Sequence, residues 1–433
     1  MRKVGGRLNV IIVGGGIGGL TLALCLNQAG IGCRIYESAA EYRPLGVGIN
    51  VLPHASRELA RLGLEAALTR AAVLTREAVF FNRFGQLIYR EPLGREAGYA
   101  DPQYSIHRAE LQRVLVDAAI ERLGAQCFRT GWKCVGVDQD AGGAVAHFVD
   151  AERGVGRSSE RADVVVACDG LHSIVRKTLH PAEGAPRYSG VNMWRGTTRW
   201  PAILTGASMI RAGWLATGKM VIYPIRDAVD GAGRQLVNWV AEVETARHDE
   251  RDWSRRGRLE DFIGAFADWH FDWLDVPAFL RAADAILEFP MVDQDPLPWW
   301  SDRRITLLGD AAHPMYPRGS NGAGQAILDA RSLADALVAE ADPVAALAAY
   351  EARRLPFTAE VVRMNRSNPP DAMLREVWKR TGDRPFERID DVISAADLAA
   401  MSERYKRVAG ADRASLAAAA ERDARVSGAG TTT

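Results

Sequence analysis

Three glycines near the start of the chain have the spacing that brings a polypeptide backbone close to a phosphate group. Gly14, Gly16 and Gly19 fit the pattern G-x-G-x-x-G directly after the apolar run NVIIV. In this pattern the first glycine allows a tight turn, the second lets the backbone approach a pyrophosphate, and the third lets helix and strand pack closely. The N-terminus of the following helix adds unpaired N–H groups that favour negative charge. The segment, with Gly18 inside it, therefore predicts a pyrophosphate site.

A carboxylate at the next strand end extends this site. Glu37 ends the apolar run CRIYE, 18 residues after Gly19 (37 minus 19), close to the roughly 20 residues expected for an acid that binds a ribose hydroxyl. Together the two features predict a ligand with an adenosine diphosphate moiety. They do not choose between NAD and FAD.

Two further motifs follow strands of the buried type. Asp169 in CDGLHSIVR comes after RADVVVA, and Asp310 in GDAAHP comes after RITLL. Ligand crevices in parallel sheets lie at the carboxyl ends of the strands. Asp310 can accept a hydrogen bond from a polyol, and the glycine-rich stretch 319–324 opens a helix against which a flat ring can rest. Pyrophosphate, polyol and flat ring are the parts of FAD, whose reduced ring the positive helix end stabilises.

The elements that must position these motifs predict an α/β protein in which one domain is discontinuous in the sequence. We expect a Rossmann-like FAD-binding domain with a mostly parallel sheet over 1–73, 102–180 and 284–366. β-rich runs predict an inserted, largely antiparallel substrate domain over 74–101 and 181–283, with a hairpin around Phe84–Gln86. A helix is expected over 257–269. Residues 367–433 are expected to form a C-terminal helical segment with a capping box at Ser394 and Asp397 and a disordered tail from Val426.

Composition narrows the functional class. The chain has 433 residues, more than one hydrophobic core usually organises, and a formal net charge of +0, which argues against a nucleic-acid partner. None of its five cysteines forms a C-x-x-C pair, and we predict no metal site. Glycines interrupt the apolar runs near the N-terminus, so neither a signal peptide nor a spanning helix is expected. A soluble, cytoplasmic protein is the prediction.

The three motifs together resemble those of the group A flavoprotein monooxygenases, the aromatic-hydroxylase family, and the match runs from about Asn9 to about Arg366. By that resemblance Glu37 holds the adenosine ribose, Arg108 reaches the FAD phosphate or ribityl region, and Asp310 holds the ribityl chain. Asp169 lies in the family's DG motif, associated with both FAD and NAD(P)H. The resemblance also implies residues next to the flavin ring: Pro317, Gly319, Asn321, Gly322, Arg43, Gly46, Val47 and Gly48.

Further stretches, including DPQYSIHR, LVNWV and MYPRGSNGAGQAILD, are similar to phenazine-carboxylate monooxygenases within this family. The resemblance implies non-covalent FAD, with NAD(P)H as a transient co-substrate because the chain has one dinucleotide fingerprint. It further implies hydroxylation, with or without decarboxylation, of a carboxylated aromatic or heteroaromatic small molecule through a flavin 4a-hydroperoxide. A dry pocket roofed by the middle β layer would protect that intermediate.

Candidate substrate-facing residues come from the β layer and the loop below it: Trp194, Arg195, Tyr223, Trp239, Met315 and Tyr316. Of these, Arg195 could pair with a carboxylate or be a surface cation, and Tyr223 could orient a phenol or simply pack. His313 could act as acid or base, although a structural role is preferred.

Two alternatives of the same fold remain open. One is a flavin reductase or epoxidase acting on an isoprenoid, whose pocket would be long and aliphatic. The other is a flavin-free prenyl-protein escort, which has little reason to keep Asp310, Asn321 and the 319–324 loop together. The tryptophan-rich middle domain favours a flat aromatic ligand. The chain is expected to be a monomer or a homodimer.

Overall fold

The computed structural model describes residues 8–42, 47–156, 158–246, 256–367, 370–418 and 421. The expectations for Arg43, Gly46 and the tail from Val426 fall outside these residues.

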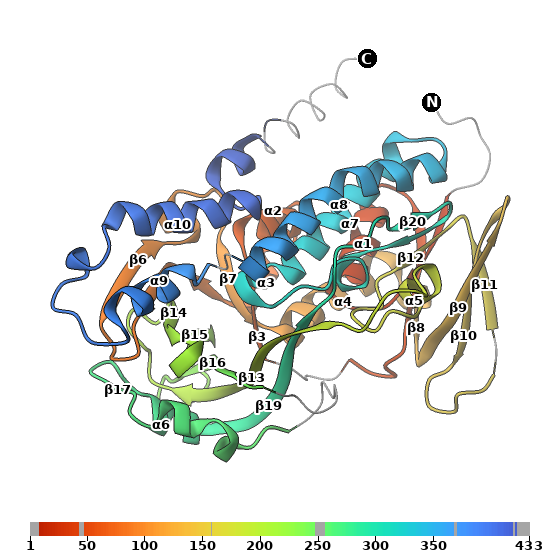
Figure 1. Cartoon of the computed structure of the whole chain (residues 1–433). Helices are drawn as coiled ribbons and strands as arrows, with labels where there is room; N and C mark the ends of the chain where they lie inside the picture. Colours follow the sequence, from red (N-terminus) through yellow and green to blue (C-terminus); the bar gives the residue numbers. More distant parts are fainter. Residues whose placement is uncertain are drawn as a thin grey trace.

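A six-stranded sheet forms the centre of the nucleotide-binding part, and its strands are mostly parallel as expected. In order they are β20 (Ser301–Asp302), β21 (Ile305–Leu307), β12 (Val164–Ala167), β1 (Asn9–Val13), β2 (Gly32–Glu37) and β8 (Phe128–Thr130). Only β20 pairs antiparallel. The central strands β1, β12 and β21 are almost entirely apolar and buried because helices cover both faces of the sheet. The covering helices are α1 (Ile17–Gln28), α4 (Arg108–Leu123), α7 (Gly322–Ala339) and α8 (Pro343–Ser367). Figure 1 shows α7 and α8 running side by side.

A seven-stranded sheet forms the second layer. In order its strands are β19 (Ala283–Asp293), β13 (Arg187–Trp200), β16 (Gln235–Glu244), β15 (Gly218–Arg226), β14 (Ser208–Trp214), β5 (Glu77–Phe81) and β6 (Leu87–Pro92). The pairs are antiparallel except β5 with β14. The hairpin expected around Phe84–Gln86 is β5–β6. Strand β19 belongs to this sheet, although the expected boundary gave residues from 284 onward to the nucleotide-binding domain.

One face of this sheet is covered by short elements instead of the helix expected over 257–269. Two 3-10 turns, η4 (Leu259–Asp261) and η5 (Ile263–Phe266), lie there with α6 (Val276–Arg281). Gly264 lowers helix propensity in the middle of the segment, and burial of Phe262 and Phe266 against the sheet holds the chain in turns instead.

The remaining elements are small. One three-stranded sheet has the order β3 (Gly48–Val51), β7 (Gln103–His107), β4 (Val73–Thr75), and a second has the order β11 (Ser158–Ala162), β10 (Gly143–Asp150), β9 (Trp132–Asp140). Strands β17 (His270–Phe271) and β18 (Leu274–Asp275) form a pair. The short helices are α2 (Pro53–Arg61), α3 (Glu65–Ala71) and α5 (Ile174–Leu179).

The C-terminal segment is helical, as expected, and it packs on the second sheet. Helices α9 (Ala372–Thr381) and α10 (Ala395–Val408) pack against residues of β5, β6 and β14. Figure 1 shows them beside β6 and β14. Ser394 is the N-cap of α10, as expected: its Oγ accepts from Asp397 N at 3.1 Å and donates to the Asp397 carboxylate at 2.8 Å.

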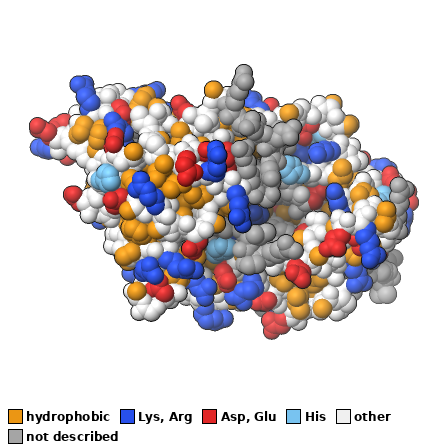
Figure 2. All heavy atoms as spheres, turned by 90° about the horizontal axis from the view of Figure 1, so that it is seen from below, with side chains coloured by type: hydrophobic (Ala, Val, Ile, Leu, Met, Phe, Trp, Pro, Cys, Tyr) orange, Lys and Arg blue, Asp and Glu red, His pale blue; other side chains and the backbone are white. Residues whose placement is uncertain are grey.

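The surface agrees with the balanced composition. On the face seen in Figure 2, acidic, basic and apolar side chains are interspersed. Among the described residues, no helix is long and apolar enough to cross a membrane.

Candidate cofactor and substrate site

The glycine turn has the geometry that a pyrophosphate requires. Gly14 has φ +103°, and its N–H donates to Tyr36 O at 2.8 Å. A Cβ on Gly14 would collide with the Cys168 carbonyl, and one on Gly19 would collide with the Gly14 carbonyl. A Cβ on Gly16, by contrast, would meet nothing within 4 Å. The first and third glycines therefore make the turn possible, while the second faces open space at the N-terminus of α1.

Gly18 lies at a packing contact of α1. A Cβ there would lie 2.8 Å from Leu308 Cδ2 and 3.2 Å from Ala326 Cβ. Gly18 thus lets α1 pack closely on the end of β21 and on α7.

The acid at the end of β2 lies beside the turn. Glu37 Oε2 accepts from Gly15 N at 2.7 Å, and Oε1 accepts from Ala39 N at 2.7 Å. The buried hydroxyl of Tyr42 is next to Gly15 and makes no hydrogen bond to the described residues. Arg108 is exposed at the first position of α4, and its neighbour Gln112 donates to Gly15 O at 3.0 Å. Glu37 and Arg108 therefore lie at the same end of the sheet as the glycine turn.

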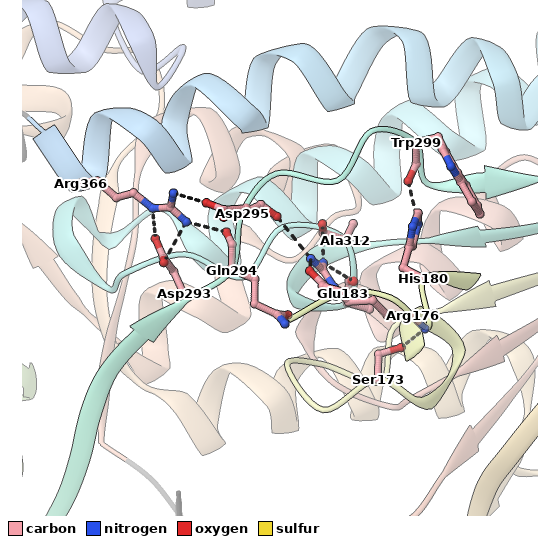
Figure 3. Close-up of polar contacts among 11 residues, drawn as sticks. Ser173, Arg176, His180, Glu183, Asp293, Gln294, Asp295, Trp299, Ala312 and Arg366 are labelled. Carbon is pink, nitrogen blue, oxygen red and sulfur yellow. Dashed lines mark hydrogen bonds and ion pairs between the residues drawn. The ribbon is translucent and has the colours of Figure 1, made fainter. Parts of the chain in front are cut away.

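Two polar residues of the DG motif, Asp169 and Arg176, have different surroundings. Asp169 Oδ2 accepts from Ile174 N at 2.9 Å, whereas its buried Oδ1 has no partner among the described residues. Burial raises the pKa of this carboxyl. Arg176 is buried: its Nη1 donates to the carbonyls of Ala311 and Ala312 at 2.9 and 2.8 Å, and its other nitrogens pair with Glu183 (Figure 3). Arg176 holds the strand-end motif that contains Asp310.

A second arginine in Figure 3 ties the end of α8 to the same region. Arg366 donates to both Asp293 oxygens at 2.6 and 2.9 Å, to Gln294 O and to Asp295. Arg176 thus holds the loop that follows β21, and Arg366 holds the chain directly after β19.

That loop presents polar groups where the flavin ring is expected. Asp310 is an exposed carboxylate in the turn η6 (Gly309–Ala311). The turn η7 (Arg318–Ser320) then contains two successive left-handed residues, Gly319 at φ +80° and Ser320 at φ +57°. Asn321 is 1% exposed, its Oδ1 has no partner among the described residues, and α7 begins directly after it.

These motifs follow adjacent strands, β2, β1, β12 and β21, so their carboxyl ends meet at one edge of the sheet. Open space at Gly16, a free Asp169 oxygen, an exposed Asp310 carboxylate and a free Asn321 acceptor match the phosphate, polyol and ring N–H groups of FAD. The residues present therefore fit this cofactor.

The expected substrate-facing residues of the β layer divide between its two faces. Trp194 stacks on Phe262 with ring centroids 5.0 Å apart, and Trp239 donates its indole N–H to Thr198 at 3.0 Å. Both tryptophans lie in the core under the 3-10 turns, so the expectation that they face the substrate is wrong. Alternate residues of a strand point to opposite faces, and Arg195 therefore points toward the nucleotide-binding domain.

Arg195 and Tyr223 do meet on that second face. Arg195 Nη2 donates to Gly48 O at 3.0 Å, while its enclosed Nε has no partner among the described residues. Tyr223 is 4% exposed and interacts with Arg195 and with Asn50. Burial raises the pKa of the Tyr223 hydroxyl despite the nearby arginine, and it lowers the pKa of Arg195.

The segment expected beside the flavin is held between Arg195 and a residue that the sequence patterns did not single out. Asn238 on β16 accepts from Gly48 N at 2.6 Å, and its buried Nδ2 has no partner among the described residues. Val47 is buried next to this contact. Side chains of the seven-stranded sheet, called the substrate sheet below, thus bond both the N–H and the carbonyl of Gly48. An asparagine within the apolar run QLVNWV was the available signal.

An apolar wall adjoins this polar group. Tyr316 is buried against Met193, Val240, Phe289 and Met291 on the same sheet face, and Met315 is partly exposed.

His313 does not join Arg195 and Tyr223. Its Nε2 lies 2.6 Å from Asp329 Oδ2, while Asp329 Oδ1 accepts from Arg354 at 2.6 Å. Although burial alone would raise the pKa of Asp329, the charges of His313 and Arg354 hold it at about 2. Asp329 also accepts from Gly309 N at 3.1 Å. His313 therefore supports the strand-end turn, and the structure gives it the preferred structural role and not a catalytic one.

A buried ion cluster joins the C-terminal segment to the substrate sheet. Asp371, directly before α9, lies 2.9 Å from Arg211 Nε and 2.5 Å from Lys219 Nζ, and Lys219 donates to Glu242 at 2.9 Å. Each of these side chains is at most 10% exposed. Among the described residues, no group of acids, histidines and cysteines could hold a metal ion.

Comparison with known proteins agrees with this site. The family model described as FAD binding domain matches residues 7–365. The phenazine 1,6-dicarboxylic acid hydroxylase PhzS of Lysobacter antibioticus is 43% identical and is aligned over 93% of this chain and 97% of its own. The 3-amino-4-hydroxybenzoate 2-monooxygenase PtnB3 of Streptomyces platensis is 37% identical, over 89% and 94%.

A solved structure shows the same architecture. Klebsiella pneumoniae HpxO, in complex with FAD and uric acid, superposes with a TM-score of 0.75 at 25% identity and covers 92% of this chain and 96% of its own. The expected similarity to phenazine-carboxylate monooxygenases is confirmed. The chain belongs to the FAD-dependent aromatic hydroxylases of the group A flavoprotein monooxygenases, which use NAD(P)H as co-substrate.

Proposed function

We propose that this monooxygenase hydroxylates a carboxylated heteroaromatic of the phenazine-carboxylate type and that Arg195 holds the carboxylate. The observation that carries the proposal is a cation without an acidic partner: no carboxylate of the described residues forms an ion pair with Arg195. Glu242, the acid whose charge acts on Arg195, is itself paired with Lys219 at 2.9 Å. A partly buried guanidinium whose Nε is enclosed and has no partner among the described residues is suited to a planar carboxylate.

The neighbouring residues fit the rest of such a ligand. The wall of Met193, Val240, Phe289, Met291 and Tyr316 can flank a flat ring and exclude water from the reacting face. Because burial raises its pKa, the Tyr223 hydroxyl stays protonated and can donate a hydrogen bond to a ring nitrogen or oxygen of the substrate. FAD, when bound between this face and the α7 N-terminus, supplies the reduction and activation of dioxygen.

The names of the relatives support an aromatic substrate over an isoprenoid one. The Lysobacter relative is named for a phenazine dicarboxylate, and the Streptomyces relative for an aminohydroxybenzoate, so each named substrate carries a ring carboxylate.

The test measures NAD(P)H oxidation and peroxide release with a substrate panel. The panel contains phenazine-1-carboxylate, phenazine-1,6-dicarboxylate, 3-amino-4-hydroxybenzoate and, as the ligand without a carboxylate, phenazine. We expect the phenazine carboxylates to accelerate NAD(P)H oxidation without a matching amount of peroxide, and phenazine not to do so. Product mass distinguishes retention from loss of the carboxylate.

The Arg195→Met variant tests the ion pair. Loss of an enclosed charge pair costs about 2 to 4 kcal/mol, so kcat/KM for the carboxylates should fall about 30- to 800-fold. Arg199→Met is the matched control, because Arg199 is on the same strand but exposed and lies 3.6 Å from Asp284. Equal kcat/KM values for wild type and Arg195→Met would refute the assignment.

A further inference from the structure

The loop expected at the flavin ring is held from behind by two residues with no assigned role. Tyr405 on α10 is 7% exposed, and Asn365 on α8 is fully buried. The Tyr405 hydroxyl accepts from Asn321 Nδ2 at 2.9 Å and donates to Asn365 Oδ1 at 2.7 Å. Asn365 in turn donates its Nδ2 to Tyr316 O at 3.3 Å. One hydrogen-bonded chain therefore connects the two ends of the segment from Tyr316 to Asn321.

The same tyrosine also shapes the middle of the loop. Its hydroxyl lies 3.4 Å from Arg318 O, and a Cβ on Gly319 would collide with it. Gly319 and Ser320 are both left-handed, a conformation that costs free energy at Ser320 and persists only where the surroundings impose it. Tyr405 lies against Gly319, directly before the strained Ser320, and supplies that constraint.

The orientation of Asn321 follows from this contact. Because its amide N–H group is committed to Tyr405, its Oδ1 must point elsewhere, and that oxygen is buried without a partner among the described residues. A buried free acceptor calls for a donor. The pyrimidine edge of the isoalloxazine ring has one, its N3–H group.

We propose that Tyr405 is a positioning residue for the flavin: it sets the Arg318–Asn321 loop and turns the Asn321 carbonyl oxygen toward the cofactor. The C-terminal segment is thereby part of the active site, although the family model ends at residue 365, before α10 begins. A second contact agrees, since Gln325 in the first turn of α7 donates to Ala409 O at 3.3 Å. The proposal rests on the assignment of this loop to the flavin ring.

The test measures the Kd for FAD by titrating apoenzyme with FAD and recording flavin fluorescence. Tyr405→Phe removes the hydroxyl and leaves the Asn321 amide unpaired and buried, so the Kd for FAD should rise about ten-fold. The visible flavin spectrum should shift, and a larger fraction of the NAD(P)H oxidised should appear as peroxide. Asn365→Ala removes the acceptor of the same hydroxyl without altering α10 and should change the Kd in the same direction.

Tyr99→Phe is the matched control. Tyr99 donates to Ala411 O at 2.8 Å, so this variant also loses one hydrogen bond to the C-terminal segment, but none to the loop. Its Kd for FAD should stay within about two-fold of wild type, since this hydrogen bond shares no partner with the Arg318–Asn321 loop and distant sites without shared partners act independently.

Two outcomes would overturn the proposal: wild-type FAD affinity and spectrum in Tyr405→Phe, or an equal loss in Tyr99→Phe. Asp310→Ala separates this failure from a wrong cofactor site. If Asp310→Ala weakens FAD binding and Tyr405→Phe does not, only the role of Tyr405 is refuted. If neither variant weakens binding, the assignment of the whole loop to FAD is refuted.

Discussion

Asp371 should be the strongest single anchor of the C-terminal segment. Its carboxylate pairs with Arg211 at 2.9 Å and with Lys219 at 2.5 Å, and it is 3% exposed. In Asp371→Asn, Lys219 keeps Glu242, but Arg211 remains buried without its counter-ion. Removing one partner of a buried ion pair costs about 3 to 5 kcal/mol, because the remaining charge is uncompensated.

The loss of stability in Asp371→Asn can be measured by thermal unfolding and compared with that of a control variant. In a cooperative unit of about 200 residues, 3 kcal/mol lowers Tm by about 6 to 12 °C. Asp383→Asn is the control, since Asp383 also joins the C-terminal segment to the substrate sheet, through Arg83 at 2.9 Å. That pair is partly exposed, at 29% and 23%, so its loss should cost about 1 kcal/mol or less.

Hydrogen exchange locates the effect. Asp371→Asn should accelerate amide exchange in α9 and α10 while the six-stranded sheet stays protected, because local opening follows the contacts that were lost. Equal Tm changes in Asp371→Asn and Asp383→Asn would refute the reasoning that burial decides the strength of these pairs.

Two further predictions concern the nucleotide-binding part. Gly16→Ala should leave the Tm of the apoprotein unchanged, because its Cβ meets only open space, but it should weaken FAD binding by filling that space. Gly14→Ala should lower the Tm and also weaken FAD binding, because a φ of +103° and a collision with Cys168 disfavour any side chain there. Equal Tm values for the two apoproteins would contradict this difference. Asp329 has a pKa lowered from 3.8 to about 2, so its stabilisation is present above pH 4 and lost as the pH falls toward 2. The free energy of unfolding, measured between pH 4 and 2 with denaturant, should therefore depend less on pH in Asp329→Asn than in wild type, and identical slopes would contradict the ion network.

The cofactor half of the site could be predicted from sequence because its requirements are local. Gly14 and Gly19 meet steric limits within one turn, and Asp169 and Asp310 directly follow strands whose order in a parallel sheet brings their ends together. The β layer was harder. Periodicity shows that Trp194 and Arg195 face opposite ways, but it does not show which face meets the nucleotide-binding domain.

The remaining residues depend on contacts between distant parts of the chain. His313 looks like a possible acid or base in the sequence, but in the fold it pairs with Asp329, 16 residues further on, which in turn pairs with Arg354, 41 residues further on. Tyr405 reaches Asn321 from 84 residues away. No spacing rule connects such positions, so a sequence pattern offers no reason to select them.

The threading of the chain also has a consequence for its synthesis. The four central parallel strands need residues from 9 to 307, and the antiparallel layer needs β5 from near residue 77 together with strands as late as residue 293. Neither layer can be completed on the ribosome until residues 307 and 293, respectively, have been translated. Exposed β edges would persist during that time, which makes the nascent polypeptide a candidate for chaperone binding.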